Sequence, residues 1–267
     1  VTDIANLSNN KVYNLITTRG WLIYNSANAN VVASTASYGT FATGADVEAC
    51  QWAIYKSENP GKFYLYNIGA GKFVGKNSDE GGRFPFVATV TNDIQVVKST
   101  TGTSHALVFS TDNYGAINHF NHTAAPGVAN WKGNANQGGL RALSDAGSAH
   151  RAVEVGAISN ETLATITELV AVYETLPELD AAIAAAEAEA AKFGDAIGLY
   201  SYTEGNYGEV LQSIKDFRNA IDENTTLAEV EEKIAILTAM PTSKKLNTPQ
   251  IGKYYRLKNA VSNRYMS

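Results

Sequence analysis

The segment "GKFYLYNIGAGKFVG" covers residues 61–75, and a closely similar segment, "GKYYRLKNAVSNRYMS", covers residues 252–267. An alignment without gaps matches Phe63 with Tyr255, Leu65 with Leu257, Asn67 with Asn259 and Phe73 with Tyr265. The start of the chain also carries a version, "KVYNL", at residues 11–15. Because the chain repeats one of its own segments, its internal repetition is the first guide to the fold.

Strand-like segments recur in four sets within residues 1–157. The sets are 50–57, 105–112 and 150–156; 31–35, 86–90 and 140–144; 20–25, 71–76 and 127–132; and 11–18, 62–69 and 115–122. Their members recur at roughly 45–55 residues, a spacing typical of a repeated supersecondary unit. Glycine and asparagine residues between them favour turns.

Four strands in each of three repeats predict a β-trefoil of twelve strands. A single repeat is too small to bury its own apolar face, whereas three repeats close a barrel and leave few free edges. A β-sandwich is the alternative, but it does not explain the repeated order. Alternation predicts which residues face the core in the first set: Trp52 and Ile54, Leu107 and Phe109, and Val153 and Val155.

Charge and composition change after residue 157. Residues 1–157 hold 11 Lys and Arg and 10 Asp and Glu, residues 158–245 hold 6 and 16, and residues 246–267 hold 4 and 0. The middle part is rich in Ala, Glu and Leu, which favour helices. We therefore predict a β domain at 1–157, a small helical bundle at 158–245 and a further segment at 246–267.

The helical bundle is predicted from apolar stripes at helical spacing. The predicted helices cover 160–175, 178–193, 207–222 and 226–239. Thr226 and Glu229 fit a capping box at the start of the last helix, and Pro241 is expected to stop it. The loop between, residues 194–209, is rich in tyrosines that we expect to pack on the bundle.

The C-terminal segment is predicted to be the first hairpin of a truncated second trefoil. Its match to residues 61–75 continues over the length of a hairpin and then stops at Ser267. A lone hairpin is marginally stable in water, so we expect it to pack on another part of the protein or on another chain. The chain is accordingly interpreted as a fragment of a longer multidomain protein.

Overall composition narrows the classes of partner. A net charge of −5 argues against nucleic acid, and no apolar run is long enough to insert into a membrane. Cys50 is the one cysteine, which excludes an internal disulfide, and we interpret it as a buried structural thiol. No cofactor is predicted, because the sequence has no phosphate loop and no dinucleotide fingerprint.

The repeated segments resemble ricin-B-like β-trefoil modules, above all "KVYNLITTRGWLIYN", "GKFYLYNIGAGKFVG" and "LNTPQIGKYYRLKNAVSNRYMS". The segment from Ala181 to Ile221 is similar to three-helix modules of the FIVAR type. The resemblance implies carbohydrate binding without catalysis, in an extracellular or cell-surface bacterial protein that processes glycans. The Gln-x-Trp signature of lectin trefoils is absent, because Gln51 and Trp52 are adjacent, and this departure weakens any transfer of sugar-contact residues.

Candidate sugar contacts combine aromatic and polar side chains, which a sugar site needs for stacking and orientation. The candidates are Tyr24, Asp112, Asn113, Tyr114, Asn118, His119, Asn121, Asn130, Trp131, Lys132 and Asn134. Tyr24 and Trp131 are expected at equivalent positions of two repeats. The alternative is an asparagine-rich turn system in which Trp131 covers the barrel end, and both interpretations stay open.

Other chemistry finds less support in the sequence. His119 and His122 resemble half a zinc site, but two residues three positions apart on a strand point to opposite faces of the sheet. A glycosidase would need two carboxylates, and the candidates are Asp112, Asp145 and Glu154. The sequence gives no reason to place two of them at the distance that glycoside hydrolysis requires. We therefore predict a non-catalytic module that binds glycans beside other domains of the same longer polypeptide. The alternative function is a structural spacer without sugar affinity.

Overall fold

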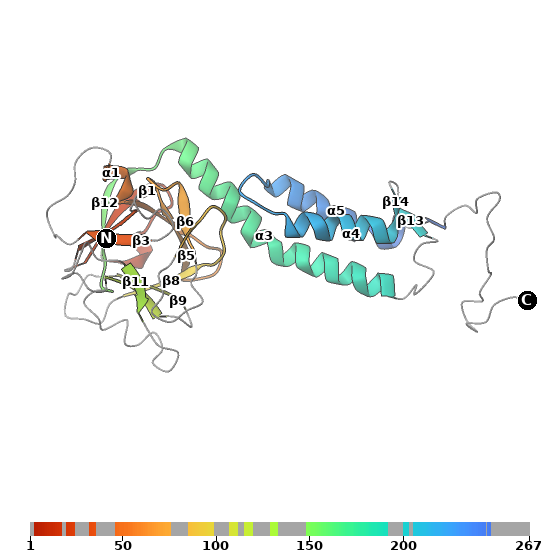
Figure 1. The fold of residues 1–267 in the computed structure, drawn as a ribbon, viewed down its shortest axis with the longest axis horizontal. Helices are drawn as coiled ribbons and strands as arrows, with labels where there is room; N and C mark the ends of the chain where they lie inside the picture. Colours follow the sequence, from red (N-terminus) through yellow and green to blue (C-terminus); the bar gives the residue numbers. More distant parts are fainter. Residues whose placement is uncertain are drawn as a thin grey trace, which may run out of the picture. The chain divides into compact units, whose positions relative to one another are not determined.

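A computed structural model describes residues 3–17, 20–24, 32–35, 46–75, 85–98, 107–111, 115–119, 129–132, 148–191, 200–202, 205–243 and 245–246. By its internal contacts the chain divides into two compact units. The first unit holds residues 1–175 and 222–227, and the second holds residues 176–221 and 228–267. Figure 1 shows that strands dominate the first unit and helices the second.

One antiparallel sheet of twelve strands forms most of the described part of the first unit. The strands are β1 (Lys11–Thr17), β2 (Gly20–Tyr24), β3 (Val32–Thr35), β4 (Gln51–Lys56), β5 (Lys62–Asn67), β6 (Lys72–Val74), β7 (Phe86–Val87), β8 (Ile94–Lys98), β9 (Leu107–Thr111), β10 (Gly115–His119), β11 (Ala129–Lys132) and β12 (Arg151–Ala157). Two short helical turns, η1 (Ile4–Asn6) and α1 (Asp46–Ala49), precede β1 and β4.

The pairing of these strands repeats after every fourth strand. We call β1–β4 repeat 1, β5–β8 repeat 2 and β9–β12 repeat 3. In each repeat the first strand pairs with the second and the second with the third. The first strand also pairs with the fourth in repeat 1 (β1 with β4) and in repeat 2 (β5 with β8). In repeat 3 the corresponding contact is a bridge between Leu107 of β9 and His150, which directly precedes β12. The fourth strand then pairs with the first strand of the next repeat.

Six strands therefore pair in a ring, and three hairpins extend from it. The ring consists of β1, β4, β5, β8, β9 and β12, and the hairpins are β2–β3, β6–β7 and β10–β11. This curled antiparallel sheet is consistent with the predicted β-trefoil.

The grouping of segments predicted for the third repeat is wrong. Segment 105–112 was predicted to be equivalent to 50–57, but β9 pairs with β10 in the way that β1 pairs with β2. Segment 127–132 was predicted to be equivalent to 20–25, whereas β11 takes the role of β3. The strand equivalent to β4 in repeat 2 is β8, which the sequence analysis did not identify. Of the other predicted strands, 140–144 lies outside the described residues.

The core of the ring confirms two of the three predicted inward pairs. Trp52 and Ile54, and Leu107 and Phe109, are buried, and the Trp52 indole N–H donates to the Leu22 carbonyl at 2.9 Å. The third pair was wrong, because Val153 and Val155 are 36% and 44% exposed and Ala152 holds the core position on β12. Cys50 is buried, as predicted.

Helix α3 (Asn160–Ala191) is continuous where the sequence predicted two helices. It begins as expected, with the Ser159 hydroxyl oxygen accepting from the Thr162 N–H at 3.1 Å. Pro177 lies inside it and removes one backbone hydrogen bond, to the carbonyl four residues earlier. Buried residues lie on both sides of that gap, Val170 and Val172 before it and Leu179 and Ala186 after it, so packing supports the helix on either side. The division between the two units falls at residues 175 and 176, within α3.

Two further helices complete the second unit. They are α4 (Tyr207–Asn219) and α5 (Leu227–Ser243). The α5 helix starts directly after Thr226, the predicted cap, but it continues past Pro241, which was expected to end it. Buried residues recur at helical spacing in this unit: Leu179 and Ala186 on α3, Leu211 and Ile214 on α4, and Val230, Leu237 and Met240 on α5.

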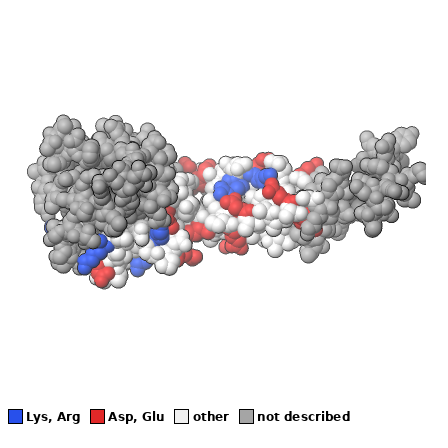
Figure 2. Space-filling model, turned by 90° about the horizontal axis from the view of Figure 1, so that it is seen from below, with Lys and Arg blue, Asp and Glu red and all other residues white. Residues whose placement is uncertain are grey.

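Ion pairs and a buried tyrosine connect α3 to α4 within the second unit. The Arg218 guanidinium donates to both oxygens of Asp180, at 2.7 and 3.0 Å, and Lys215 lies 2.6 Å from Glu187. Figure 2 shows basic side chains beside acidic ones on the helical part of the chain. Tyr207 is fully buried and its hydroxyl donates to the Ala186 carbonyl at 3.3 Å, so one predicted loop tyrosine does pack on the helices.

A small sheet replaces part of the predicted loop at residues 194–209. It consists of β13 (Tyr200–Tyr202), β14 (Gly205–Asn206) and β15 (Lys245–Leu246), with β13 in the centre. The predicted C-terminal hairpin at 246–267 lies outside the described residues apart from Leu246. Within the described part of the chain, no helix has both the length and the hydrophobicity that crossing a membrane requires.

Candidate functional site

The β10–β11 hairpin brings five of the predicted site residues together. Its register pairs Ala116 with Lys132, Ile117 with Trp131, Asn118 with Asn130 and His119 with Ala129. Paired positions of antiparallel strands lie on one face, and the face alternates along each strand. Positions 117, 119, 129 and 131 therefore share one face, and positions 116, 118, 130 and 132 share the other.

Ile117 identifies which of these faces belongs to the core. Its side chain is fully buried in the ring core, so position 131 lies on the core face of the hairpin. Positions 118, 130 and 132 lie on the opposite, outer face. The predicted cluster is thus divided: Asn118, Asn130 and Lys132 occupy one face, and His119 and Trp131 occupy the other.

The same positions in repeats 1 and 2 can be read from the register. Leu22, Val74 and Ile117 are equivalent, and their partners across the hairpins are Ser34, Phe86 and Trp131. Phe86 is buried and stacks on Trp52, with ring centroids 6.1 Å apart. Position 131 therefore corresponds to a core position of repeat 2.

The predicted equivalence of Tyr24 and Trp131 is wrong. Tyr24 lies two positions beyond Leu22 on β2, and the residue two positions beyond Ile117 is His119. The Tyr24 ring is half-buried and meets the Phe86 ring edge-on, with centroids 5.4 Å apart. Tyr24 thus packs beside the core, and the error came from taking β11 as the equivalent of β2.

Asn118 and Asn130 distinguish repeat 3 on the outer face. The equivalent pairs are Ile23 with Ala33 in repeat 1 and Gly75 with Pro85 in repeat 2. The two other repeats thus carry no polar side chain at these positions. The remaining candidates, Asp112, Asn113, Tyr114, Asn121 and Asn134, lie outside the described residues, and so does His122 of the possible zinc pair.

Glu154, the described member of the possible glycosidase carboxylates, lies in a surface ion pair. Its carboxylate is 2.7 Å from the Lys11 ammonium, and both side chains are well exposed. The hydrogen bond and charge of Glu154 raise the pKa of Lys11. Among the residues that the structure describes, no group of His, Cys, Asp and Glu side chains is placed to hold a metal ion.

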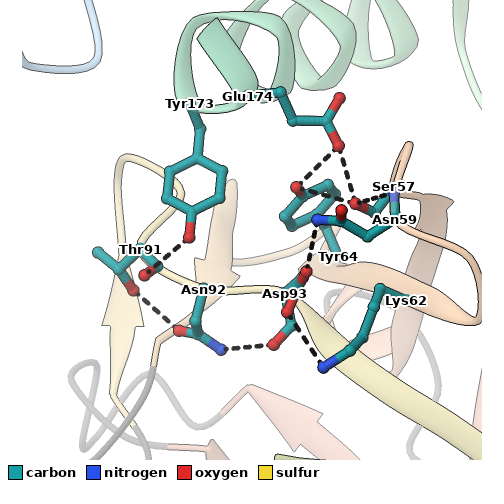
Figure 3. Close-up of polar contacts among 9 residues, drawn as sticks. All are labelled: Ser57, Asn59, Lys62, Tyr64, Thr91, Asn92, Asp93, Tyr173 and Glu174. Atoms are coloured by element: carbon teal, nitrogen blue, oxygen red, sulfur yellow. Dashed lines mark hydrogen bonds and ion pairs between the residues drawn. The ribbon is translucent and has the colours of Figure 1, made fainter. Parts of the chain in front are cut away.

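A second polar cluster, which was not predicted from the sequence, lies where the first half of α3 meets the sheet (Figure 3). One oxygen of Glu174 accepts three hydrogen bonds of 2.9 Å, from the Tyr64 hydroxyl, the Ser57 hydroxyl and the Glu58 N–H. Beside it, Asp93 accepts from Asn59 at 3.1 Å and lies 3.6 Å from the Lys62 ammonium. The Tyr173 hydroxyl donates to the Thr91 carbonyl at 3.4 Å.

Burial raises the pKa of the tyrosine hydroxyls in this cluster. It is the largest cause of the raised pKa of both Tyr64 and Tyr173, and the carboxylate of Glu174 raises both further. Both phenols are therefore protonated donors at neutral pH, which suits a structural contact. The signal in the sequence was "KFYLYN", where apolar and aromatic residues at consecutive positions indicate a strand buried on both faces.

No protein-family model matches the chain, and no curated protein matches it. Several solved structures are similar to part of it. An agglutinin from Rhizoctonia solani is 13% identical over 55% of this chain and 96% of its own, with a TM-score of 0.39. A ricin B-like lectin from Macrolepiota procera, solved with lactose, is 12% identical over 56% and 99%, with a TM-score of 0.40. A GlcNAcα1-4Gal-releasing endo-β-galactosidase from Clostridium perfringens is 11% identical over 54% and 32%, with a TM-score of 0.38. All three TM-scores lie below 0.5, and the threefold strand pairing is the observation that supports the fold.

Proposed function

We propose that residues 1–157 form a β-trefoil that recognises carbohydrate and has no catalytic activity. The threefold strand pairing supports the fold, and the pair Asn118–Asn130 supports the function. In a sheet whose other two hairpins are apolar at these positions, an asparagine pair serves no packing purpose. Departures of this kind from a repeated pattern are expected where function overrides packing.

The proposed sugar contacts lie on the outer face of the β10–β11 hairpin. Asn118 and Asn130 each offer a donor and an acceptor, which matches the hydroxyl groups of a sugar ring. Lys132, on the same face, adds a cationic donor. Asp112, Asn113 and Tyr114 join β9 to β10 in sequence, and Tyr114 is the residue proposed to stack on the ring.

The parent protein is proposed to be extracellular or attached to the cell surface, where the other domains of a longer polypeptide process glycans. One such site is expected to bind glycan weakly by itself. Several binding modules linked in one polypeptide would strengthen binding, because each bound module raises the effective concentration of glycan at the others.

A glycan array, followed by calorimetry on the full 267-residue chain, tests this function. Asn118→Ala and Asn130→Ala should each weaken binding roughly tenfold, because each removes a hydrogen-bonding group from the ligand. Asn92→Ala is the matched control, since Asn92 lies in the loop between β7 and β8 and bonds only locally to Thr91 and Asp93 in the described contacts. An array without a hit, or equal affinity of all variants, would contradict the proposal.

A structural spacer is the second candidate, and the attachment of α3 favours it. The first half of the helix is held on the sheet by the Glu174 hydrogen bonds and by apolar contacts, which suits a spacer module. This function predicts no affinity for any glycan on the array.

A further inference from the structure

The outer face of β5 is covered by the first half of α3. Phe63 and Leu65 point into the ring core, whereas Tyr64 and Tyr66, at the alternate positions, belong to a second apolar cluster. The helix contributes Ile166, Leu169 and Val170 to that cluster, and all three are buried. Both faces of β5 are thus closed to water, one by the ring and the other by the helix.

This covered surface is particular to repeat 2. The positions equivalent to Tyr64 and Tyr66 are Asn14 and Ile16 in repeat 1 and Val108 and Ser110 in repeat 3. The Tyr64 ring meets the Tyr173 ring of the helix edge-on, with centroids 5.9 Å apart. Among the described residues, repeat 2 alone therefore offers a tyrosine pair to a helix.

Polar contacts fix the position of the helix along this surface. Glu174 brings a carboxylate to the edge of the apolar cluster, where a charge is stable only with donors around it. Tyr64, Ser57 and the Glu58 N–H supply three, as Figure 3 shows for the first two side chains. Two turns earlier on the helix, the Tyr55 hydroxyl donates to the Thr167 hydroxyl at 3.2 Å.

The connection from β12 to α3 leaves no room for a flexible linker. Two residues, Ile158 and Ser159, separate the strand from the helix. Ile158 is buried and its N–H donates to the Asn10 carbonyl at 3.1 Å, while Ser159 caps the helix. Every residue of the connection is therefore held by the sheet or by the helix.

We propose that β5 carries a helix-binding surface, that residues 158–175 of the same chain are its partner, and that these residues fold and unfold together with the sheet. The cooperative β unit then ends near residue 175, after the predicted domain boundary at 157. The proposal is independent of any affinity for glycans.

Native-state hydrogen exchange on the full chain tests it. In low concentrations of denaturant, the amides of β5 and of residues 160–175 should exchange with one common free energy of opening. The amides of α4 and α5 supply the comparison, because those helices lie in the second unit.

Two pairs of variants separate the helix–sheet contact from helix stability. Val170→Ala should accelerate exchange roughly tenfold in both β5 and residues 160–175, because it empties part of the shared cluster. Thr165→Ala, on the exposed side of the same helix, should change neither segment. Glu174→Ala should act like Val170→Ala, and Glu178→Ala, one turn further and exposed, is its control.

The proposal fails if Val170→Ala and Glu174→Ala accelerate exchange in the helix and leave β5 protected. It also fails if residues 160–175 exchange together with α4 and α5 in the unmodified chain. Should Val170→Ala yield too little folded protein, Glu174→Ala decides by the same readout, because it leaves every apolar contact in place.

Discussion

Leu107 and His150 exchange two main-chain hydrogen bonds: the Leu107 N–H donates to the His150 carbonyl at 2.6 Å, and the His150 N–H donates to the Leu107 carbonyl at 2.8 Å. These bonds join β9 to the start of β12 and complete the ring of six strands. The register makes position 150 equivalent to Trp52 and Ile94, both core residues. Repeat 3 thus has a histidine where the other repeats have apolar side chains.

The free energy of unfolding should fall as the pH is lowered through the range in which His150 is protonated in the unfolded chain but neutral in the folded chain. Burial lowers the pKa of His150 from 6.5 to about 4. Between these values the unfolded chain binds a proton that the folded chain does not, so the full stability is present above 6.5 and decreases toward 4. At about 1.4 kcal/mol for each pKa unit, the total loss is about 3 kcal/mol.

Urea denaturation at pH 7.5, 5.5 and 4.5 measures this effect. His150→Ile is the matched variant, since an isoleucine occupies the equivalent position of repeat 2, and it should lack this part of the pH dependence. Equal pH dependence in both proteins would show that His150 is not its source.

Gly69→Ala should destabilise the first unit by roughly 2 kcal/mol, because a new side chain would overpack a rigid contact. A Cβ at position 69 would lie 2.7 Å from the Ala49 nitrogen and 2.8 Å from the Glu48 carbonyl carbon. Both are backbone atoms, so no side chain can move away. Gly156→Ala is the control, because a Cβ there meets nothing within 4 Å. Thermal unfolding of both variants decides, and equal melting temperatures would contradict the close approach.

Trp131→Ala should lower stability and leave glycan affinity unchanged. Its position is equivalent to that of the buried Phe86, and truncating a large core aromatic costs roughly 3–5 kcal/mol. Denaturation and calorimetry on the same preparation separate the two effects. Lost binding with unchanged stability would restore Trp131 as a sugar contact.

The Arg218–Asp180 pair should contribute little to the stability of the second unit. The hydrogen bonds from Arg218 lower the pKa of Asp180, so the contribution is present near neutral pH and is lost as the pH falls through the lowered pKa of Asp180. Both side chains are partly exposed, and exposed pairs contribute less than about 1 kcal/mol. A double-mutant cycle with Arg218→Ala and Asp180→Ala measures the coupling, which 1 M salt should reduce. A coupling that salt leaves unchanged would show that the pair is shielded from solvent.

The sequence predicted that the chain contains a threefold repeat, but it did not predict which strands of repeat 3 are equivalent to those of repeats 1 and 2. The segment "IQVVK" at 94–98 forms β8, the strand equivalent to β4, whereas the sequence interpretation gave that place to the following strand, β9. Pattern alone also misassigned β12, where Val153 and Val155 alternate like core residues and yet lie on the outer face. Pairing decided that outcome, because Ala152 is opposite the core residue Leu15.

The candidate site was only partly predictable for a related reason. The sequence showed that asparagines and aromatics gather between residues 112 and 134, but it did not show which of them share a face. Hairpin register, which depends on both strands at once, separates Asn118 from Trp131. The contact of Glu174 with Tyr64 spans 110 residues and has no local signal in the sequence.

Amide NMR titration of the full chain with the glycan that binds best tests whether the β10–β11 hairpin recognises carbohydrate. Chemical-shift changes should concentrate at residues 115–119 and 129–132 and saturate as one site per chain, and Asn118→Ala should need roughly tenfold more glycan to reach the same change. Changes confined to the helical part, or the failure of every glycan to shift any amide of repeat 3, would contradict carbohydrate recognition by this hairpin.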